Sequence, residues 1–214
     1  MRSLVRGAAV ASVLLLITGP VAAAQTGLTA QLTNDAETHP VVPTLETGAP
    51  RPVSFGFATF TLSADQTTLV WTAIVNNIDV TGSQTADTND DLVAAHIHAG
   101  PGVAPGVNGP VVWGFFGAPF NDTDPTDTEL VPFIDGVGGT FTSKWDLTEG
   151  NGTTLAEQVP NILGGRAYIN FHTRQFPAGE IRGDLAVVPE PSTVLLLGSG
   201  LAGLGLMARR RRAR

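Results

Sequence analysis

The sequence predicts an all-β domain, a Greek-key β-sandwich of eight or nine strands, flanked by an N-terminal signal helix and a C-terminal transmembrane helix. Three observations lead to this prediction. The 214-residue chain contains 25 Gly and 15 Pro, and only 14% of its residues are charged, a composition typical of turn-rich β proteins. Between residues 25 and 187, short β-rich runs alternate with turn clusters, and no long amphipathic helical pattern interrupts them. Both ends of the chain place apolar segments beside arginines, as targeting segments do.

Residues 1–24 have the three parts of a secretory signal peptide. Arg2 and Arg6 form a basic start, and residues 8–17 form a short apolar core. Ala22-Ala23-Ala24 satisfies the small-x-small rule for cleavage by signal peptidase. An uncleaved membrane anchor is the alternative, but the short core favours cleavage and export.

The middle of the chain contains nine segments with strand character, the last of them weak. They are residues 28–32, 53–62, 69–75, 92–98, 110–116, 140–147, 166–173, 180–187 and 130–134. One short helix is predicted over residues 153–163, limited to about two turns by Pro160. We expect the three tryptophans, Trp71, Trp113 and Trp145, to contribute to one core.

The segment 53–62 carries an irregular apolar pattern. Val53, Phe55 and Phe57 share one face. The apolar residues then switch to the opposite face, at Ala58, Phe60 and Leu62. A strand alternates its side chains between two faces, so this switch predicts a β-bulge after Phe57.

Two loops stand out between the strands. The segment 34–52 contains four prolines and little periodicity, which predicts a surface excursion. The segment 121–135 is rich in Asp and Glu, whose hard oxygens suit Ca²⁺, although the spacing is not that of an EF-hand. A solvated acidic loop is the favoured interpretation of this segment.

The C-terminal segment 188–214 has three parts in a fixed order. Pro189-Glu190-Pro191 is followed by 17 apolar or small residues, which at ~1.5 Å per residue span about 25 Å as a helix, enough for a thin hydrocarbon core. The chain then ends in a basic cluster: Arg209, Arg210, Arg211, Arg212 and Arg214. The positive-inside rule would keep this cluster cytoplasmic. A plain tail anchor is one interpretation of such a segment.

This tripartite tail resembles the PEP-CTERM sorting signal of Gram-negative bacteria. The resemblance implies recognition by an exosortase, processing near the Pro-Glu-Pro motif after an inner-membrane stage, and delivery to the cell surface or the extracellular space.

Two blocks of the domain carry a second resemblance. The first block is Ala95-His96-Ile97-His98-Ala99-Gly100-Pro101, which continues through residues 108–112. The second runs over residues 165–173, with Tyr168-Ile169-Asn170-Phe171-His172-Thr173, and continues through residues 176–185, with Pro177-Ala178-Gly179-Glu180-Ile181-Arg182-Gly183. In this order they resemble the CHRD domain, a module named after chordin and common in exported bacterial proteins. The resemblance covers about residues 28–187, and the domain is assigned to residues 25–187. The motif residues that match are Gly100, Asn170, Thr173, Gly179, Glu180 and Arg182.

The histidines of these blocks suggest a metal site. His96 and His98 are two residues apart on a strand, so both imidazoles face one side. If the sandwich brings His172 alongside, three nitrogens suit Zn or Cu, with Glu180 or Asp184 as an oxygen ligand. The alternative is that the three histidines only hydrogen-bond neighbouring strands.

The His-Ile-His block also distantly resembles the first copper-ligand strand of copper/zinc superoxide dismutases. The later ligands and the cysteines of that family have no match here, so dismutase activity is not inferred. No nucleophile–base pair accompanies the histidines, and we therefore expect a protein that is not an enzyme.

Charge and cysteine content exclude several functions. With a pI near 4.9, the chain is no nucleic-acid binder, since that needs a basic face. It has no Cys, which excludes disulfides and thiolate sites. Residues 25–188 contain 5 basic and 18 acidic residues, hence a net charge of −13, so a partner should be neutral, cationic or bridged by a cation.

Three hypotheses follow for the function. The first is an exported, non-catalytic binding or matrix module, with an exopolysaccharide or another surface component as partner. The second is a Zn or Cu protein that uses His96, His98 and His172, with Ca²⁺ at the acidic loop less favoured. The third is a structural envelope protein without a specific ligand.

Overall fold

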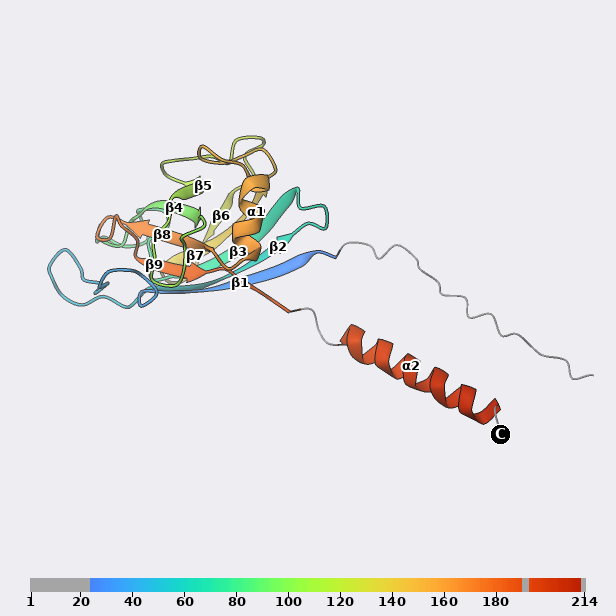
Figure 1. Ribbon diagram of the computed structural model, residues 1–214. Coiled ribbons are helices and arrows are strands. Elements are labelled where there is room, and N and C mark those ends of the chain that lie inside the picture. The colour runs from blue at the N-terminus through green and yellow to red at the C-terminus, as the bar shows by residue number, and fades with distance from the viewer. Residues whose placement is uncertain (1–23, 190–192, 213–214) are drawn as a thin grey trace, which may run out of the picture.

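The computed structural model describes residues 24–189 and 193–212 (Figure 1). The predicted all-β class is confirmed. The strands are β1 (Thr26–Thr33), β2 (Phe55–Leu62), β3 (Thr68–Asn76), β4 (Leu92–Ala99), β5 (Val111–Phe116), β6 (Glu129–Pro132), β7 (Gly138–Asp146), β8 (Ala167–Thr173), β9 (Ile181–Asp184) and β10 (Ala186–Val187). The helices are α1 (Leu155–Leu163) and α2 (Thr193–Arg212).

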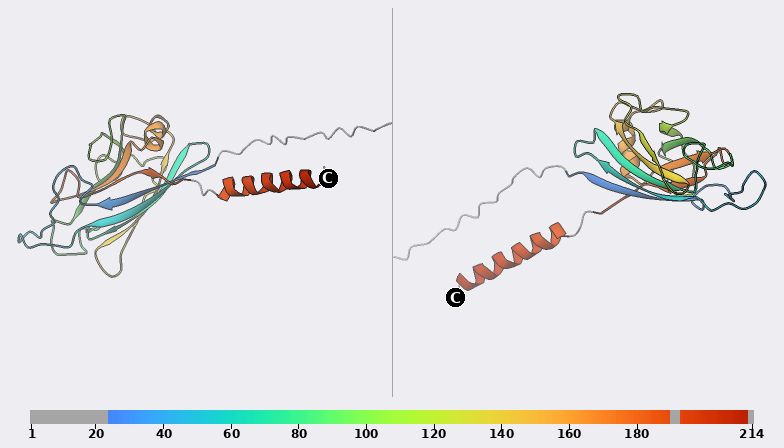
Figure 2. Two further views of the ribbon diagram at one scale, coloured as in Figure 1. Left: turned by 60° about the horizontal axis from the view of Figure 1, so that its bottom comes forward. Right: turned by 180° about the vertical axis from the view of Figure 1, so that it is seen from behind.

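The strands form one curled antiparallel sheet rather than two separate ones. Its order is β5-β4-β8-β9-β1-β2-β3-β7-β6, and β10 pairs with the start of β1. The chain passes between the two halves of this sheet after β3, after β5 and, through α1, after β7. Strands β1 and β9 join the halves by pairing at Thr33 and Arg182, and the halves fold over each other as the two layers of a sandwich (Figure 2).

Aromatic side chains fill the space between the layers. Trp71 of β3 contacts Phe115 of β5, with ring centroids 4.5 Å apart. Trp113 of β5 stacks on Trp145 of β7 at 5.6 Å. All three tryptophans are buried, as predicted. Because these contacts join β5 in one half of the sheet to β3 and β7 in the other, they hold the curl of the sheet closed.

Strand β2 is regular, and the predicted bulge is wrong. Each residue from Phe55 to Leu62 pairs in continuous register with β1 and β3. Phe55 and Phe57 lie on the outer face, with Phe57 42% exposed, whereas Gly56, Ala58 and Phe60 point inward. Gly56 fits there because an added Cβ would lie 2.4 Å from the carbonyl oxygen of Ile74. Large apolar residues on the outer face, opposite small ones inside, produced the misleading pattern.

The predicted helix is confirmed as α1. Thr154 caps it and forms a reciprocal pair of hydrogen bonds with Glu157, which satisfies free N–H groups of the first turn. Leu155 and Val159 are buried against the sheet, and Pro160 lies inside the helix. Nine residues make about two and a half turns.

The acidic segment 121–135 does not converge on a cation site. The carboxylate of Asp122 is buried and accepts backbone N–H groups of Asp127 and Thr128. Asp127 instead pairs with Lys144 at 3.0 Å, and Lys144 also pairs with Asp146 at 3.1 Å. These contacts give Asp122 and Asp127 local partners, and among the described residues no carboxylate of this segment belongs to a group placed to hold a metal ion.

The two ends of the domain lie side by side. Leu28 of β1 pairs with Val187 of β10, and the N–H of Val188 donates to the carbonyl of Gly27. Both ends therefore leave the domain at the same place (Figure 1). The predicted signal peptide falls almost entirely on residues 1–23, which lie outside the described residues.

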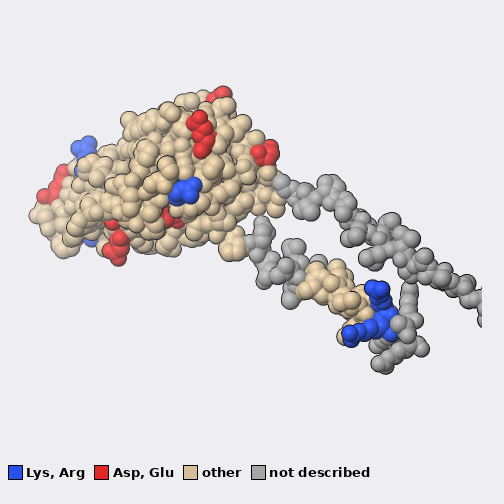
Figure 3. Space-filling view, viewed as in Figure 1, with Lys and Arg blue, Asp and Glu red and all other residues tan. Residues whose placement is uncertain are grey.

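Helix α2 forms where the tail predicts a helix, and it ends in the arginine cluster (Figure 3). Within the described part of the chain, neither helix combines the length and apolar character that crossing a membrane requires. The reason lies in the sequence, because the apolar stretch is diluted by Gly198, Gly200, Gly203 and Gly205 and the helix continues into arginines.

Candidate functional site

Strands β4, β8 and β9 turn one face away from the aromatic core, and this face is polar but buried. Asn170 of β8 pairs in register with His96 on β4 and with Arg182 on β9. The polar side chains of this face are His96, His98, Tyr168, Asn170, His172 and Arg182, and each is at most 8% exposed. Ile169 and Phe171 point into the core, as the alternation predicted.

The three histidines come together as the sequence suggested. One ligand nitrogen from each of His96, His98 and His172 lies within 4.8 Å of the other two. His96 Nδ1 and His172 Nε2 are 3.2 Å apart. His172 is distant from the other two histidines in sequence. The pairing of β4 with β8, in which Ala94 opposes His172, brings it close to them in space.

The outer nitrogen of each imidazole is held by a backbone carbonyl. His96 Nε2 lies 3.1 Å from the Ala118 oxygen, His98 Nδ1 lies 2.9 Å from the Gly109 oxygen, and His172 Nδ1 lies 3.1 Å from the Pro177 oxygen. A carbonyl oxygen only accepts, so each of these nitrogens carries the proton.

The inner nitrogens of neutral imidazoles are therefore bare lone pairs. The facing pair, His96 Nδ1 and His172 Nε2, has no proton to share in these tautomers, and His98 Nε2 has no hydrogen-bond partner among the described residues. Metal-bound histidines characteristically donate their other N–H to a carbonyl or carboxylate, which fixes the tautomer and the ring orientation. The donor set fits a cation held by three imidazole nitrogens, as Zn and Cu prefer.

Burial keeps the trio neutral at physiological pH. Desolvation lowers the pKa of His98 to about 4, and desolvation together with the other two histidines lowers the pKa of His172 to about 4. Desolvation also lowers the pKa of His96. Neutral imidazole is the form that binds a metal, so protons compete little with a cation near pH 7.

Neighbouring residues fix the positions of the rings. His98 stacks on Tyr168, with centroids 4.5 Å apart and planes within 7°. The Arg182 guanidinium covers the Tyr168 ring at 3.6 Å, and Arg182 is itself held by the carbonyl of Ala104 and the carboxylate of Asp184, both through Nη2. This stack explains why the Arg-Gly-Asp part of the motif belongs to the site without contacting the inner nitrogens.

Gly114 of β5 allows the loop that contains Pro119 to approach the strand and cover His96. A Cβ at this position would lie 1.8 Å from the Pro119 carbonyl oxygen and 3.0 Å from His96 Cδ2. Only a residue without a side chain fits between strand and loop.

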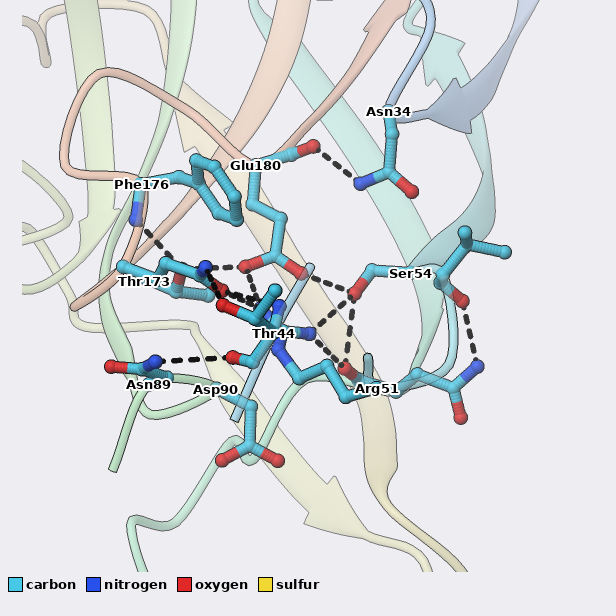
Figure 4. Close-up of polar contacts among 12 residues, drawn as sticks. Asn34, Thr44, Arg51, Ser54, Asn89, Asp90, Thr173, Phe176 and Glu180 are labelled. Atoms are coloured by element: carbon cyan, nitrogen blue, oxygen red, sulfur yellow. Dashed lines mark hydrogen bonds and ion pairs between the residues drawn. The ribbon is translucent and has the colours of Figure 1, made fainter. Parts of the chain in front are cut away.

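Glu180 does not join the histidines, contrary to one sequence-based suggestion. Its buried carboxylate pairs with Arg51 at 2.6 Å and accepts hydrogen bonds from Ser54 and, at 2.5 Å, from Thr173 (Figure 4). Asp184, the other suggested oxygen ligand, is engaged by Arg182 at 2.8 Å. The hairpin places both carboxylates within ion pairs of their own, so neither is a ligand here.

The remaining motif residues are structural. Gly100 begins the turn after β4, where its carbonyl accepts from the N–H of Val103. Thr173 ties β8 to Glu180 through its hydroxyl. Gly179 has a φ of +124°, which only glycine adopts readily, and its N–H closes the turn on the Phe176 carbonyl at 3.0 Å.

The segment 34–52 contributes more than a surface excursion, and that prediction is wrong for its polar side chains. The amide of Asn34 donates to the Glu180 carbonyl at 2.8 Å. Arg51 reaches Glu180, and Glu37 is buried near Gly179. No local pattern marks these residues, because an irregular segment has no periodicity from which burial can be inferred.

The sorting residues lie at the edge of what the structure describes. Pro189 ends the described part of the domain, while Glu190 and Pro191 lie outside the described residues. Arg209 and Arg210 are exposed at the end of α2. The backbone of Arg211 and Arg212 completes that helix.

Comparison with known proteins identifies two families in the chain. The CHRD domain matches residues 28–185, and the PEP-CTERM protein-sorting motif matches residues 187–212. No match was found among curated proteins or among solved structures. The sorting motif implies processing by an exosortase and export to the envelope or surface of a Gram-negative cell. Since the CHRD match covers most of the chain, this protein belongs to the CHRD domain family and carries a PEP-CTERM sorting signal.

Proposed function

We propose that this exported protein is a metal-binding module of the cell surface, and that His96, His98 and His172 hold one Zn or Cu ion. The single observation that carries the proposal is the arrangement of the imidazoles. Each has its outer N–H held by a backbone carbonyl, and one ring nitrogen from each lies within 4.8 Å of the other two. A cation is the partner that turns this arrangement from repulsive to attractive.

We further propose that the site binds rather than catalyses. The three histidines are 5–8% exposed, so loops separate the inner nitrogens from bulk solvent, whereas catalytic zinc sites keep a position open to substrate. A buried ion of this kind stabilises the loops that cover it or keeps the metal at the surface of the cell. The high negative charge of the domain is compatible with attraction of cations from solution.

Metal content and thermal unfolding test this proposal. The exported protein, stripped with a chelator, is titrated with Zn²⁺ and with Cu²⁺, and bound metal is counted by elemental analysis. We expect one tightly bound ion per chain. At a free metal concentration 100 times the dissociation constant, binding stabilises the fold by about 2.7 kcal/mol, which raises the melting temperature by roughly 5–10 °C for a domain of this size.

Two histidine variants separate the site from general effects. His98→Gln should lose the ion and the thermal shift. His39→Gln is the matched control, because His39 contacts Phe176 through its ring and is not part of the trio. The proposal fails if the stripped protein takes up no ion, or if the two variants bind it equally well.

We also propose that the precursor passes through an inner-membrane stage before an exosortase acts near residues 189–191. The pairing of β10 with β1 leaves only residues 188–192 between the folded domain and α2, a reach of about 17 Å when fully extended. The cleavage machinery must therefore act close to the domain. Replacing Pro189, Glu190 and Pro191 by alanine should leave a full-length precursor in the inner-membrane fraction on immunoblots; normal maturation would contradict this.

A further inference from the structure

One buried charge near the histidines lacks a direct ion partner. Arg182 pairs with Asp184 at 2.8 Å, and Arg51 pairs with Glu180 at 2.6 Å. Glu37 is 9% exposed, and neither of its carboxylate oxygens has a hydrogen-bond partner among the described residues. Because the two neighbouring ion pairs are each neutral overall, the neighbourhood carries one uncompensated negative charge when Glu37 is ionised.

Glu37 lies near Asn170, the central residue of the histidine face. Both side chains approach the backbone of Gly179. A Cβ at that glycine would lie 2.5 Å from Glu37 Oε1 and 2.7 Å from each of the amide atoms Asn170 Oδ1 and Nδ2. Asn170 is flanked by His96 on β4 and by Arg182 on β9. Glu37 and His96 are therefore both neighbours of Asn170 in the fold.

The unpartnered atoms around Asn170 are all acceptors. They are His98 Nε2, Asn170 Oδ1 and both carboxylate oxygens of Glu37. Buried polar atoms in folded proteins are almost always paired. A cation among these buried acceptors would offer positive charge to them. The cation already proposed for the histidines supplies that charge.

We propose that Glu37 is the counter-charge of the cation held by His96, His98 and His172, and that it acts across Asn170. This inference rests on the proposed metal site and adds a residue that neither the motifs nor the histidine cluster contain. The segment that carries Glu37 is tied to the β8–β9 hairpin by Asn34, whose amide donates to the Glu180 carbonyl.

The state of Glu37 without metal supports the same role. Burial raises its pKa to about 7, although the Arg182 guanidinium opposes the rise. A carboxyl group so raised destabilises the metal-free fold at neutral pH, because the ionised form is favoured in water and disfavoured in the protein.

Glu37→Gln tests the inference, since it removes the charge and keeps the shape. The affinities of the stripped full chain for Zn²⁺ and Cu²⁺ are measured by competition with a chromogenic chelator at pH 7.5. We expect Glu37→Gln to weaken binding by about 10-fold or more, because the variant removes a buried negative charge that attracts the cation. The metal-free variant should unfold at a temperature equal to or higher than that of the parent.

A control variant and the parent protein keep the outcomes distinct. Glu46→Gln alters an exposed carboxylate of the same segment and should leave the affinity unchanged. If the parent binds metal and Glu37→Gln binds it equally tightly, this inference is overturned while the histidine site stands. If the parent binds no metal, the proposed function itself has failed. If Glu37→Gln is destabilised without metal, Glu37 has a structural role and the inference is again overturned.

Discussion

The buried ion pair between Arg51 and Glu180 offers the sharpest test of how the domain is held together. Both side chains are at most 3% exposed, and the shortest contact between them is 2.6 Å. Glu180→Gln keeps the size of the side chain but removes its charge. The Arg51 guanidinium, which also donates to the Asn77 carbonyl at 3.2 Å, would then remain buried without its counter-ion.

The expected loss is large because a buried charge cannot recover its hydration. Breaking one partner of a buried pair typically costs about 3–5 kcal/mol. Thr173 and Ser54 donate to different oxygens of Glu180 through hydroxyls. In the Gln variant one hydroxyl can donate to the amide oxygen and the other can accept from the amide NH2, which limits any further loss. Buried Asp90 also interacts electrostatically with Arg51, so it partly offsets the guanidinium charge when Glu180 is replaced. We therefore place the loss near the lower bound, about 3 kcal/mol.

Urea unfolding followed by circular dichroism at pH 7 measures this loss. The double variant Arg51→Met/Glu180→Gln should lose less than the two single variants together, because no uncompensated charge remains. Asp146→Asn serves as the surface control; it breaks a half-exposed pair with Lys144 and should cost below about 1 kcal/mol. A loss below about 1 kcal/mol for Glu180→Gln, or strict additivity in the double variant, would refute the reasoning.

Three further predictions concern the histidines, the turn and the outer face. In metal-free protein, His98 and His172 have a pKa of about 4 against 6.5 in the unfolded chain, so the unfolded state binds more protons and stability falls as the pH drops from about 6.5 towards 4. The loss of stability is about 3 kcal/mol per histidine. Urea midpoints measured at pH 7 and 4.5 should therefore differ less in His98→Gln than in the parent protein. An equal difference in the two proteins would contradict this prediction. Gly179→Ala should cost about 1–3 kcal/mol from its φ of +124° alone, and an unchanged melting temperature would show that the turn is not strained. Phe57→Thr should change the free energy of unfolding by less than about 0.5 kcal/mol, whereas Phe60→Thr should lower it by about 3–5 kcal/mol. If urea unfolding shows the larger loss for Phe57→Thr, the bulge predicted from the sequence is supported instead.

Some features of the site follow from local sequence. The alternation of Tyr168, Asn170 and His172 places them on one strand face, and the spacing of His96 and His98 places those two together. The turn over residues 176–179 is also readable from its Pro and Gly. The whole of β8 is buried, however. A period of two shows which residues share a face but cannot tell which face meets the core when both are covered.

Other features depended on contacts between distant segments. Sequence alone could not determine that Arg51 takes Glu180 away from the histidines, or that Glu37 comes to lie beside Asn170. Both residues belong to the irregular segment 34–52, where backbone direction is set by what the segment packs against. The interpretation of 53–62 failed for a related reason, because the exclusion of Phe57 from the core depends on Gly56 fitting closely against Ile74 of β3.

The sequence by itself determined the all-β class, the approximate positions of the strands, the family and the sorting tail, because these depend on periodicity, turn residues and short motifs. Tertiary structure decided which polar groups meet. The β4–β8 pairing brings His172 to His96, and the loops around them hold the outer nitrogens and exclude water. The electrostatic character of the site, three bare nitrogens shielded from solvent, arises from burial and from contacts between segments far apart in the chain.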